Sequence, residues 1–139
     1  MVTPKATATM TKSQQMSRVR SSDTAPERLV RRLLSAQGVR YRLHVKKLPG
    51  TPDLYIGRLR LAIFVNGCFW HGHDCPRGGR PKSNEGFWNV KLDRNRERDA
   101  KVLNELAKLR VGTLTLWQCA MRDYEKVVVR IAKRYRKTL

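Results

Sequence analysis

The sequence predicts an α/β fold, and three observations support this fold class. A segment with a helical apolar stripe lies near the N-terminus, and a second such segment closes the chain. Between them lie several short segments with strand patterns. The longest uninterrupted apolar run, residues 61–65 (LAIFV), is typical of a buried strand.

The first helix is predicted to begin at Thr24. Thr24 and Glu27 have the spacing of a capping box, and Pro26 is tolerated in a first helical turn. Gly38 is suited to the position that follows the end of a helix. One face of this helix should be buried, because it carries an apolar stripe of Leu29, Val30, Leu33 and Leu34.

Strands are expected next. Apolar and polar residues alternate over residues 41–46, which predicts a half-buried strand, and Pro49 and Gly50 mark a turn. Two further strands are predicted at residues 52–56 and 58–65.

A loop is expected from Asn66 to Gly86, followed by a helical region over residues 87–109 that we interpret as two successive helices. Residues 111–117 form the fourth predicted strand. The closing helix is predicted from a stripe of Tyr124, Val127, Val128, Ile131, Ala132 and Tyr135.

The charge of the chain indicates a polyanionic partner. Thirty Lys and Arg face 11 Asp and Glu, giving a net charge of +19 on 139 residues. Nucleic acid is the favoured partner, because neutralising phosphates releases condensed counterions. No basic amphipathic segment favours the alternative of an anionic membrane surface, and a ribosome-associated or merely soluble basic protein remains open.

The length fits one domain, which we assign to residues 24–139. Residues 1–23 contain no aromatic ring and are rich in Thr, Ser, Lys and Arg, so we expect a flexible basic arm. No apolar stretch reaches the roughly 18 residues of a membrane span, and no signal peptide is visible. Three cysteines fit poorly with a self-contained disulfide framework and favour a reduced, intracellular protein.

The densest group of chemically versatile residues lies at residues 66–75 (NGCFWHGHDC). Together with Cys119, which follows the last predicted strand, this segment offers three thiols and an imidazole, a preferred zinc ligand set. On spacing alone His71 competes with His73, and Asp74 is a weaker candidate. The alternative is three free thiols. The predicted zinc ligands are Cys68, His73, Cys75 and Cys119.

Phe69 and Trp70 lie within this ligand-rich loop. Adjacent aromatic residues usually belong to a core. In a strongly basic protein they are also suited to insertion between DNA base steps, which is easiest at a weakened step such as a mismatch.

Three carboxylates are candidates for phosphodiester chemistry, in which a metal held by carboxylates polarises the phosphate. Asp53 follows Pro52 at the start of a predicted strand, where the pair could equally be a turn signal. Glu27 has an alternative role in the capping box. Asp99 could instead form an ion pair on a solvated helix.

Five strings carry a family resemblance: TAPERLVRRLL, LPGTPDLYI, FVNGCFWHGHDC, FWNVKLDRNRERD and LWQCAMR. In this order they resemble the very short patch repair (Vsr) DNA mismatch endonucleases, a branch of the PD-(D/E)xK nuclease superfamily. The resemblance covers about residues 16–122. It implies a restriction-endonuclease-like three-layer core (α-β-β-β-α-β) with a structural zinc loop and an N-terminal arm across the DNA.

The resemblance also implies roles for the candidate residues. Asp53 would be the principal ligand of a catalytic Mg²⁺, assisted by the backbone carbonyl of Val65, and Glu27 would lie near this metal. His71 would help to activate the attacking water, with Asp99 acting on it through solvent.

By the same resemblance, Cys68, His73, Cys75 and Cys119 would bind structural Zn²⁺, and Met16, Phe69 and Trp70 would wedge into the duplex beside the mismatch. Two departures stand out. Asn66 replaces a histidine found in some relatives, and no D-x-K or E-x-K tripeptide follows Asp53 at the usual strand position.

The implied activity is a Mg²⁺-dependent nick 5′ to the T of a T·G mismatch, the product of 5-methylcytosine deamination. The expected partner is double-stranded DNA with such a mismatch, and mismatch-repair proteins are candidate partners. We expect a monomer in the bacterial cytoplasm, at the nucleoid when bound, without membrane contact. The alternatives are a restriction-type endonuclease without mismatch specificity and a non-catalytic zinc-dependent DNA-binding module.

Overall fold

The computed structural model describes residues 23–68, 70, 71, 73, 75, 79 and 84–138. Met16, with the rest of the predicted arm up to residue 22, lies outside the described residues, as do Phe69 and Asp74. Within the described ranges, no helix is both long and apolar enough to cross a membrane.

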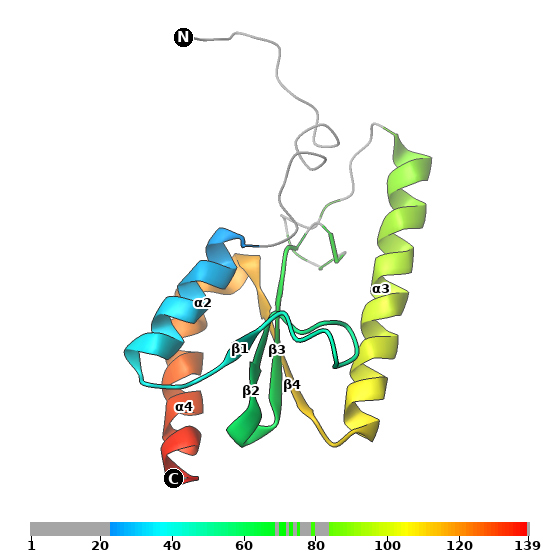
Figure 1. Cartoon of the computed structure of the whole chain (residues 1–139). Coiled ribbons are helices and arrows are strands. Elements are labelled where there is room, and N and C mark those ends of the chain that lie inside the picture. Colours follow the sequence, from blue (N-terminus) through cyan, green and yellow to red (C-terminus); the bar gives the residue numbers. More distant parts are fainter. Residues whose placement is uncertain are drawn as a thin grey trace, which may run out of the picture.

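A four-stranded mixed sheet forms the centre of the structure (Figure 1). The strands lie in the order β1-β2-β3-β4, so that neighbours in sequence are also neighbours in space. The first three strands are antiparallel, whereas β4 pairs parallel with β3. Their bounds are Arg42–Leu43 for β1, Leu54–Ile56 for β2, Leu61–Asn66 for β3 and Gly112–Trp117 for β4.

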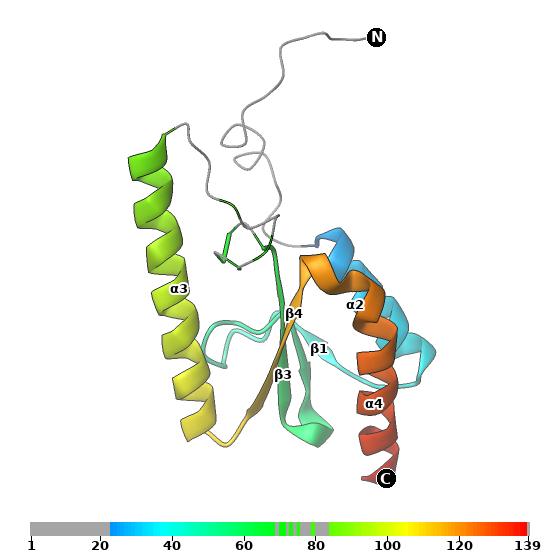
Figure 2. The ribbon, with the colours of Figure 1, turned by 180° about the vertical axis from the view of Figure 1, so that it is seen from behind.

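Helices cover both faces of this sheet (Figures 1 and 2). Helix α3 (Glu85–Lys108) lies on one face, and α2 (Ala25–Ala36) and α4 (Tyr124–Lys137) lie on the other. Side chains of β3 alternate between the two resulting cores, as strand geometry requires. Ile63 packs in the core with α2 and α4, and Ala62 packs in the core with α3.

Helices α2 and α4 confirm the predictions that were made from their apolar stripes. In α2, Val30 and Leu34 are fully buried, and Gly38 follows the helix with a φ of 74°. Thr24 is the N-cap, and its backbone N–H donates to the Glu27 carboxylate at 3.1 Å, as a capping box requires. In α4 the buried residues are Tyr124, Val128, Ile131, Ala132 and Tyr135.

Several predicted elements were wrong in extent. The region predicted as two helices is one helix, α3, of 24 residues. Residues 87–108 contain neither Gly nor Pro, so nothing in the charge-dense middle interrupts the helix. The third strand begins at Leu61 rather than at residue 58, because Gly57–Leu59 form a 3₁₀ turn (η1) and Arg60 has a φ of 48°.

The first strand is also shorter than predicted and is not half-buried. Strand β1 contains only Arg42 and Leu43, and both are exposed. It ends where His44 adopts a φ of 47°, a left-handed conformation outside the β region.

The connection from β1 to β2 packs against α3 at Gly50. This residue has a φ of 76°, and a Cβ there would lie 2.4 Å from the Val102 Cγ1 atom of α3. Only glycine satisfies both the backbone conformation and this close approach. The contact fixes the course of the chain three residues before Asp53.

Candidate functional site

The predicted site residues converge where β3 and β4 end. Because these strands are parallel, Asn66 and Trp117, their last residues, pair at the same end of the sheet. Strand β2 is antiparallel to β3, so its beginning, next to Asp53, also lies toward this end of the sheet. One end of the sheet therefore presents Asp53 beside the loop that follows β3.

The main chain holds Asp53 on two sides. The backbone N–H of Val65 donates to Asp53 Oδ2 at 2.7 Å, and the carbonyl of Asp53 accepts the N–H of His44 at 3.0 Å. The N–H and C=O groups of one strand residue point to the same side of the strand. The Val65 carbonyl therefore also points toward the side on which Asp53 lies.

Glu27, His44 and Asp53 form a cluster whose potential ligand atoms all lie within 4.8 Å of one another. The Glu27 side chain is only 4% exposed, and its Oε1 lies 3.9 Å from His44 Nε2. His44 Nδ1 lies 4.0 Å from Asp53 Oδ1. Glu27 thus caps α2 and faces Asp53, so its two predicted roles are compatible.

The cluster changes the ionisation of Asp53. Burial, together with the charge and side-chain hydrogen bond of Glu27, raises the pKa of Asp53 to about 6, although the Val65 N–H and His44 act in the opposite direction. Two carboxylates that share a buried site disfavour each other's charge. A cation bound between them would relieve this cost, so the arrangement fits a divalent metal ion.

His71 and Asp99 form a second pair. His71 Nδ1 lies 2.5 Å from Asp99 Oδ2, so they contact directly rather than through solvent, which corrects the geometry implied by the resemblance. His71 comes from the loop after β3, where its N–H donates to the Gly67 carbonyl at 3.3 Å. Asp99 comes from α3, so helix and loop meet at this hydrogen bond.

Two adjoining hollows connect these groups. The smaller, of about 220 Å³, is lined by Asp53, Val65, His71, Arg98 and Asp99 among others. The larger, of about 690 Å³, also contains His71 and Asp99 in its lining, together with His73, Arg96 and Trp117. The structure therefore brings Asp53 and the His71–Asp99 pair to one space, with guanidinium groups beside it.

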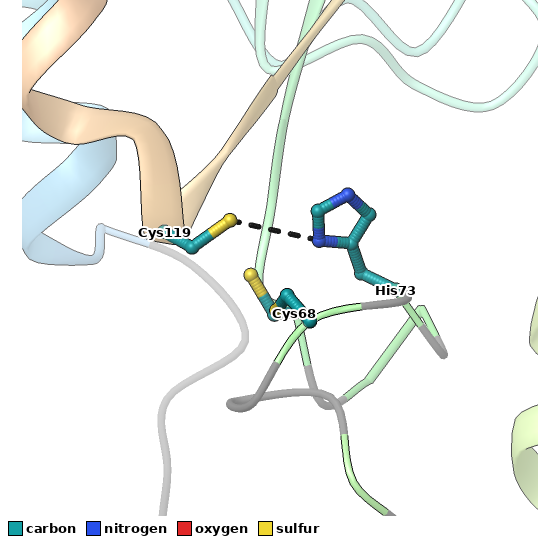
Figure 3. A group of neighbouring side chains, drawn as sticks. Cys68, His73 and Cys119 are labelled. Carbon is teal, nitrogen blue, oxygen red and sulfur yellow. Dashed lines mark hydrogen bonds between the residues drawn. The ribbon is translucent and has the colours of Figure 1, made fainter.

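The four predicted zinc ligands also come together, with their ligand atoms all within 4.8 Å of one another. Cys119 Sγ lies 3.6 Å from His73 Nδ1 (Figure 3). Sulfur and nitrogen ligands of a tetrahedral zinc ion are separated by about 3.6 Å, so this spacing fits the ion. Cys119 belongs to the 3₁₀ segment η3 (Gln118–Asp123), which follows β4 directly.

The thiols of this cluster interact strongly. Burial raises the pKa of Cys68 to about 12, and the neighbouring thiols of Cys75 and Cys119 add to this effect, whereas a backbone hydrogen bond with Cys119 opposes it. A thiolate is the form that binds metal, so binding here would release protons. His71 lies outside this cluster, which separates the two histidines that spacing alone could not distinguish.

Trp70 is partly buried, as its alternative interpretation as a core residue predicts. Its ring packs edge-on against Trp88 of α3, with 5.4 Å between centroids. Its carbonyl accepts a hydrogen bond from Asn95 Nδ2 at 2.9 Å, and Lys91 Nζ lies 5.8 Å from its ring centroid. The described part of the loop is therefore anchored to α3.

The sequence interpretation did not identify three residues of this region. Trp117 stacks on His73 at a centroid distance of 4.0 Å, Asn95 holds Trp70, and His44 completes the carboxylate cluster. Of these three, only His44 could have been identified from the sequence. It is one of three histidines in the chain, and the other two already had candidate roles.

Asp53→Asn should stabilise the zinc-loaded protein in Mg²⁺-free buffer above about pH 6. The folded-state pKa of Asp53 is raised, so the folded protein binds more protons than the unfolded chain between about pH 4 and 6, and stability falls as pH rises through that window. The substitution should recover about 1–3 kcal/mol of unfolding free energy at pH 7.5, and little at pH 4.

Urea unfolding at the two pH values measures this difference. Glu97→Gln, which removes an exposed carboxylate of α3 that lines neither hollow, is the control. An Asp53→Asn protein that is no more stable than wild type at pH 7.5 would show that the ionised carboxylate of Asp53 does not destabilise the fold.

Comparison with known proteins identifies the family of the chain. The family model "DNA mismatch endonuclease Vsr" matches residues 6–77. The chain is 45% identical over 116 residues to the type II nicking enzyme V.XorIIP of Xanthomonas oryzae pv. oryzae, covering 84% of this chain and 85% of the relative. It is 38% identical over 117 residues to DNA mismatch endonuclease Vsr of Escherichia coli, covering 84% and 75%. The chain therefore belongs to the Vsr family of DNA mismatch endonucleases.

Proposed function

We propose that this protein is a Mg²⁺-dependent DNA endonuclease that nicks one strand 5′ to the T of a T·G mismatch. The observation that carries the proposal is the convergence of Asp53 and the His71–Asp99 pair on one small hollow. A carboxylate suited to a metal and a histidine suited to proton transfer are what phosphodiester hydrolysis requires. The absent lysine of the superfamily motif is compatible with this assignment if the His71–Asp99 pair performs its role.

Asp53 and the Val65 carbonyl would hold Mg²⁺, with Glu27 beside them. Oxygen ligands are those that Mg²⁺ prefers, and the raised pKa of Asp53 favours occupation by a cation. When bound, the ion would polarise the scissile phosphate and lower the pKa of the attacking water.

His71 would orient and deprotonate that water. With its Nδ1–H donated to Asp99, the ring presents Nε2 as the free acceptor. Asp99 would then stabilise the imidazolium that forms, as the carboxylate of a hydrolytic triad does. Asp99 is thus a positioning residue, and His71 is the base.

DNA is the substrate that the charges favour. The net charge of +19 provides sequence-independent attraction to phosphates, and Arg96 and Arg98 line the hollows that would receive the scissile strand. The mismatch specificity is supported by the name of the E. coli relative, and strand nicking by the names of the type II nicking enzymes.

Met16, Phe69 and Trp70 would open the duplex beside the mismatch. Trp70 packs on Trp88, so its insertion would exchange one aromatic contact for stacking on a base. The Asn95 hydrogen bond would keep the backbone of Trp70 attached to α3 during this exchange.

A structural Zn²⁺ held by Cys68, His73, Cys75 and Cys119 would join the loop after β3 to η3 after β4. The ligand spacing and the three-thiol, one-imidazole set support this ion. It would fix the loop that carries both His71 and Trp70.

We further infer the cellular setting and architecture that accompany this activity. The helices on both faces of the sheet are compatible with a restriction-endonuclease-like core, with residues 1–23 as a basic arm and 24–139 as the endonuclease domain. The protein would act as a monomer in the bacterial cytoplasm, with mismatch-repair proteins as candidate partners.

End-labelled duplexes with a T·G mismatch should be nicked 5′ to the T in Mg²⁺ and not in EDTA, while the fully paired duplex stays intact.

Phe69→Ala/Trp70→Ala should reduce the preference for the mismatch by at least about tenfold, because about one to three kcal/mol of stacking is lost per ring. Phe87→Ala, which removes an exposed ring of α3, is the control. Equal cutting of both duplexes would indicate a restriction-type nuclease, and binding without cutting would indicate a DNA-binding module.

The purified chain should contain one zinc ion, measured by plasma mass spectrometry. His73→Gln should lose zinc, because it removes one of four ligands, whereas His71→Gln should retain zinc and lose nicking. Loss of zinc from both variants alike would contradict the separate roles of the two histidines.

A further inference from the structure

We propose that His44 contributes an imidazole nitrogen to the divalent-cation site of Glu27 and Asp53, so that this site binds Mn²⁺ with a selectivity over Mg²⁺ that depends on His44. The inference rests on the proposed cation at Asp53 and adds a nitrogen ligand to it. His44 received no role from the sequence interpretation.

The spacing of the cluster fits a shared ion better than a hydrogen-bonded pair. His44 Nε2 lies 3.9 Å from Glu27 Oε1 and His44 Nδ1 lies 4.0 Å from Asp53 Oδ1, both beyond hydrogen-bonding distance. One nitrogen would bind the ion, and one potential ligand atom from each of the three residues lies within 4.8 Å of the other two. Atoms that each bind one ion at about 2.1 Å lie roughly 3.0 Å apart in cis and about 4.2 Å apart in trans. Whichever nitrogen binds the ion, its distance to the carboxylate oxygen that it faces falls within that interval.

The main chain holds the ring in this position. Strand β1 stops at Leu43, and His44 takes a left-handed φ of 47°, which is uncommon for a residue other than glycine. Its N–H donates to the Asp53 carbonyl, and the Val45 N–H donates to the Pro52 carbonyl at 3.2 Å. The backbone segments that carry the ring and the carboxylate are therefore joined by two adjacent hydrogen bonds.

The exposure of the three side chains allows an ion to enter. Glu27 is almost fully buried and Asp53 is 21% exposed, whereas His44 is 38% exposed. The imidazole thus forms the solvent side of the cluster. A site with one nitrogen and two carboxylates favours Mn²⁺ more strongly than an all-oxygen site does, because Mg²⁺ prefers oxygen ligands.

Mn²⁺ binding to the full-length, zinc-loaded protein tests this inference without reference to nicking. Mn²⁺ does not compete well for a thiolate site, so the zinc cluster stays occupied. Electron paramagnetic resonance measures free Mn²⁺ during titration, and pulsed measurements detect the ¹⁴N nucleus of a bound imidazole. Mg²⁺ affinity follows from competition with Mn²⁺.

Wild type should show ¹⁴N coupling to Mn²⁺. His44→Gln should abolish it and weaken Mn²⁺ binding by about tenfold, while Mg²⁺ binding changes by less than about threefold. His71→Gln, the matched control, should retain the coupling. His44→Asn, which tolerates the left-handed backbone, gives a second variant if His44→Gln does not fold.

Several outcomes would overturn the inference. These are ¹⁴N coupling that persists without His44, coupling that is lost with His71, and equal weakening of Mn²⁺ and Mg²⁺ binding, which would mean that His44 positions the carboxylates without binding the ion. Asp53→Asn separates this failure from that of the proposed function. If Asp53→Asn removes cation binding and His44→Gln does not, only the role of His44 is wrong. If Asp53→Asn binds Mn²⁺ like wild type, the proposed cation site itself is wrong.

Discussion

The burial of Asp53 beside Glu27 is the constraint on which the rest of the site depends. Two carboxylates with little exposure share one end of the sheet, and this raises the pKa of Asp53 to about 6. Such a pair is costly without a cation. The fold nevertheless holds it firmly, through the capping box of α2, the Val65 N–H and the turn that packs Gly50 against α3. The buried Asp53–Glu27 pair therefore lowers the unfolding free energy, and a metal ion bound to these carboxylates would restore it.

Outside this acidic pair the chain is strongly basic, and the proposed mechanism uses both the basic surface and the acidic pair. A net charge of +19 attracts a phosphate backbone, and Arg96 and Arg98 line the hollows that contain His71 and Asp99. Catalysis would depend on one acidic pair in a basic surface. The Trp70–Trp88 contact fixes the loop against α3, where His71 meets Asp99, and a metal ion in the Cys–His cluster would fix the loop further. Misplacing such groups by about one ångström costs much of the rate.

Much of this arrangement could be predicted from the sequence, because periodicity and capping are local properties. The stripes of α2 and α4, the buried run of β3 and the grouping of the three cysteines with a histidine all follow from residue type and spacing. The choice of His73 over His71 followed from the family resemblance and not from spacing. Long-range geometry could not be predicted. The direct His71–Asp99 contact depends on where α3 passes the loop. The position of the His44 side chain depends on the left-handed φ of His44 itself, at the end of β1. The expectation of two successive helices over residues 87–109 was wrong, because residues 87–108 contain no Gly or Pro that would end the first of them.

Single-turnover nicking of a T·G duplex by Asp53→Asn and Asp99→Asn, with DNA affinity measured in parallel by fluorescence anisotropy, tests the central claim most directly. The account predicts that Asp53→Asn nicks at least about a hundredfold more slowly, because it removes a metal ligand, and that Asp99→Asn is impaired through His71. Both should bind DNA within about threefold of wild type, because a carboxylate does not attract phosphate. Glu97→Gln, on an exposed position of the same helix, should nick normally. Nicking by Asp53→Asn at the wild-type rate would contradict the account.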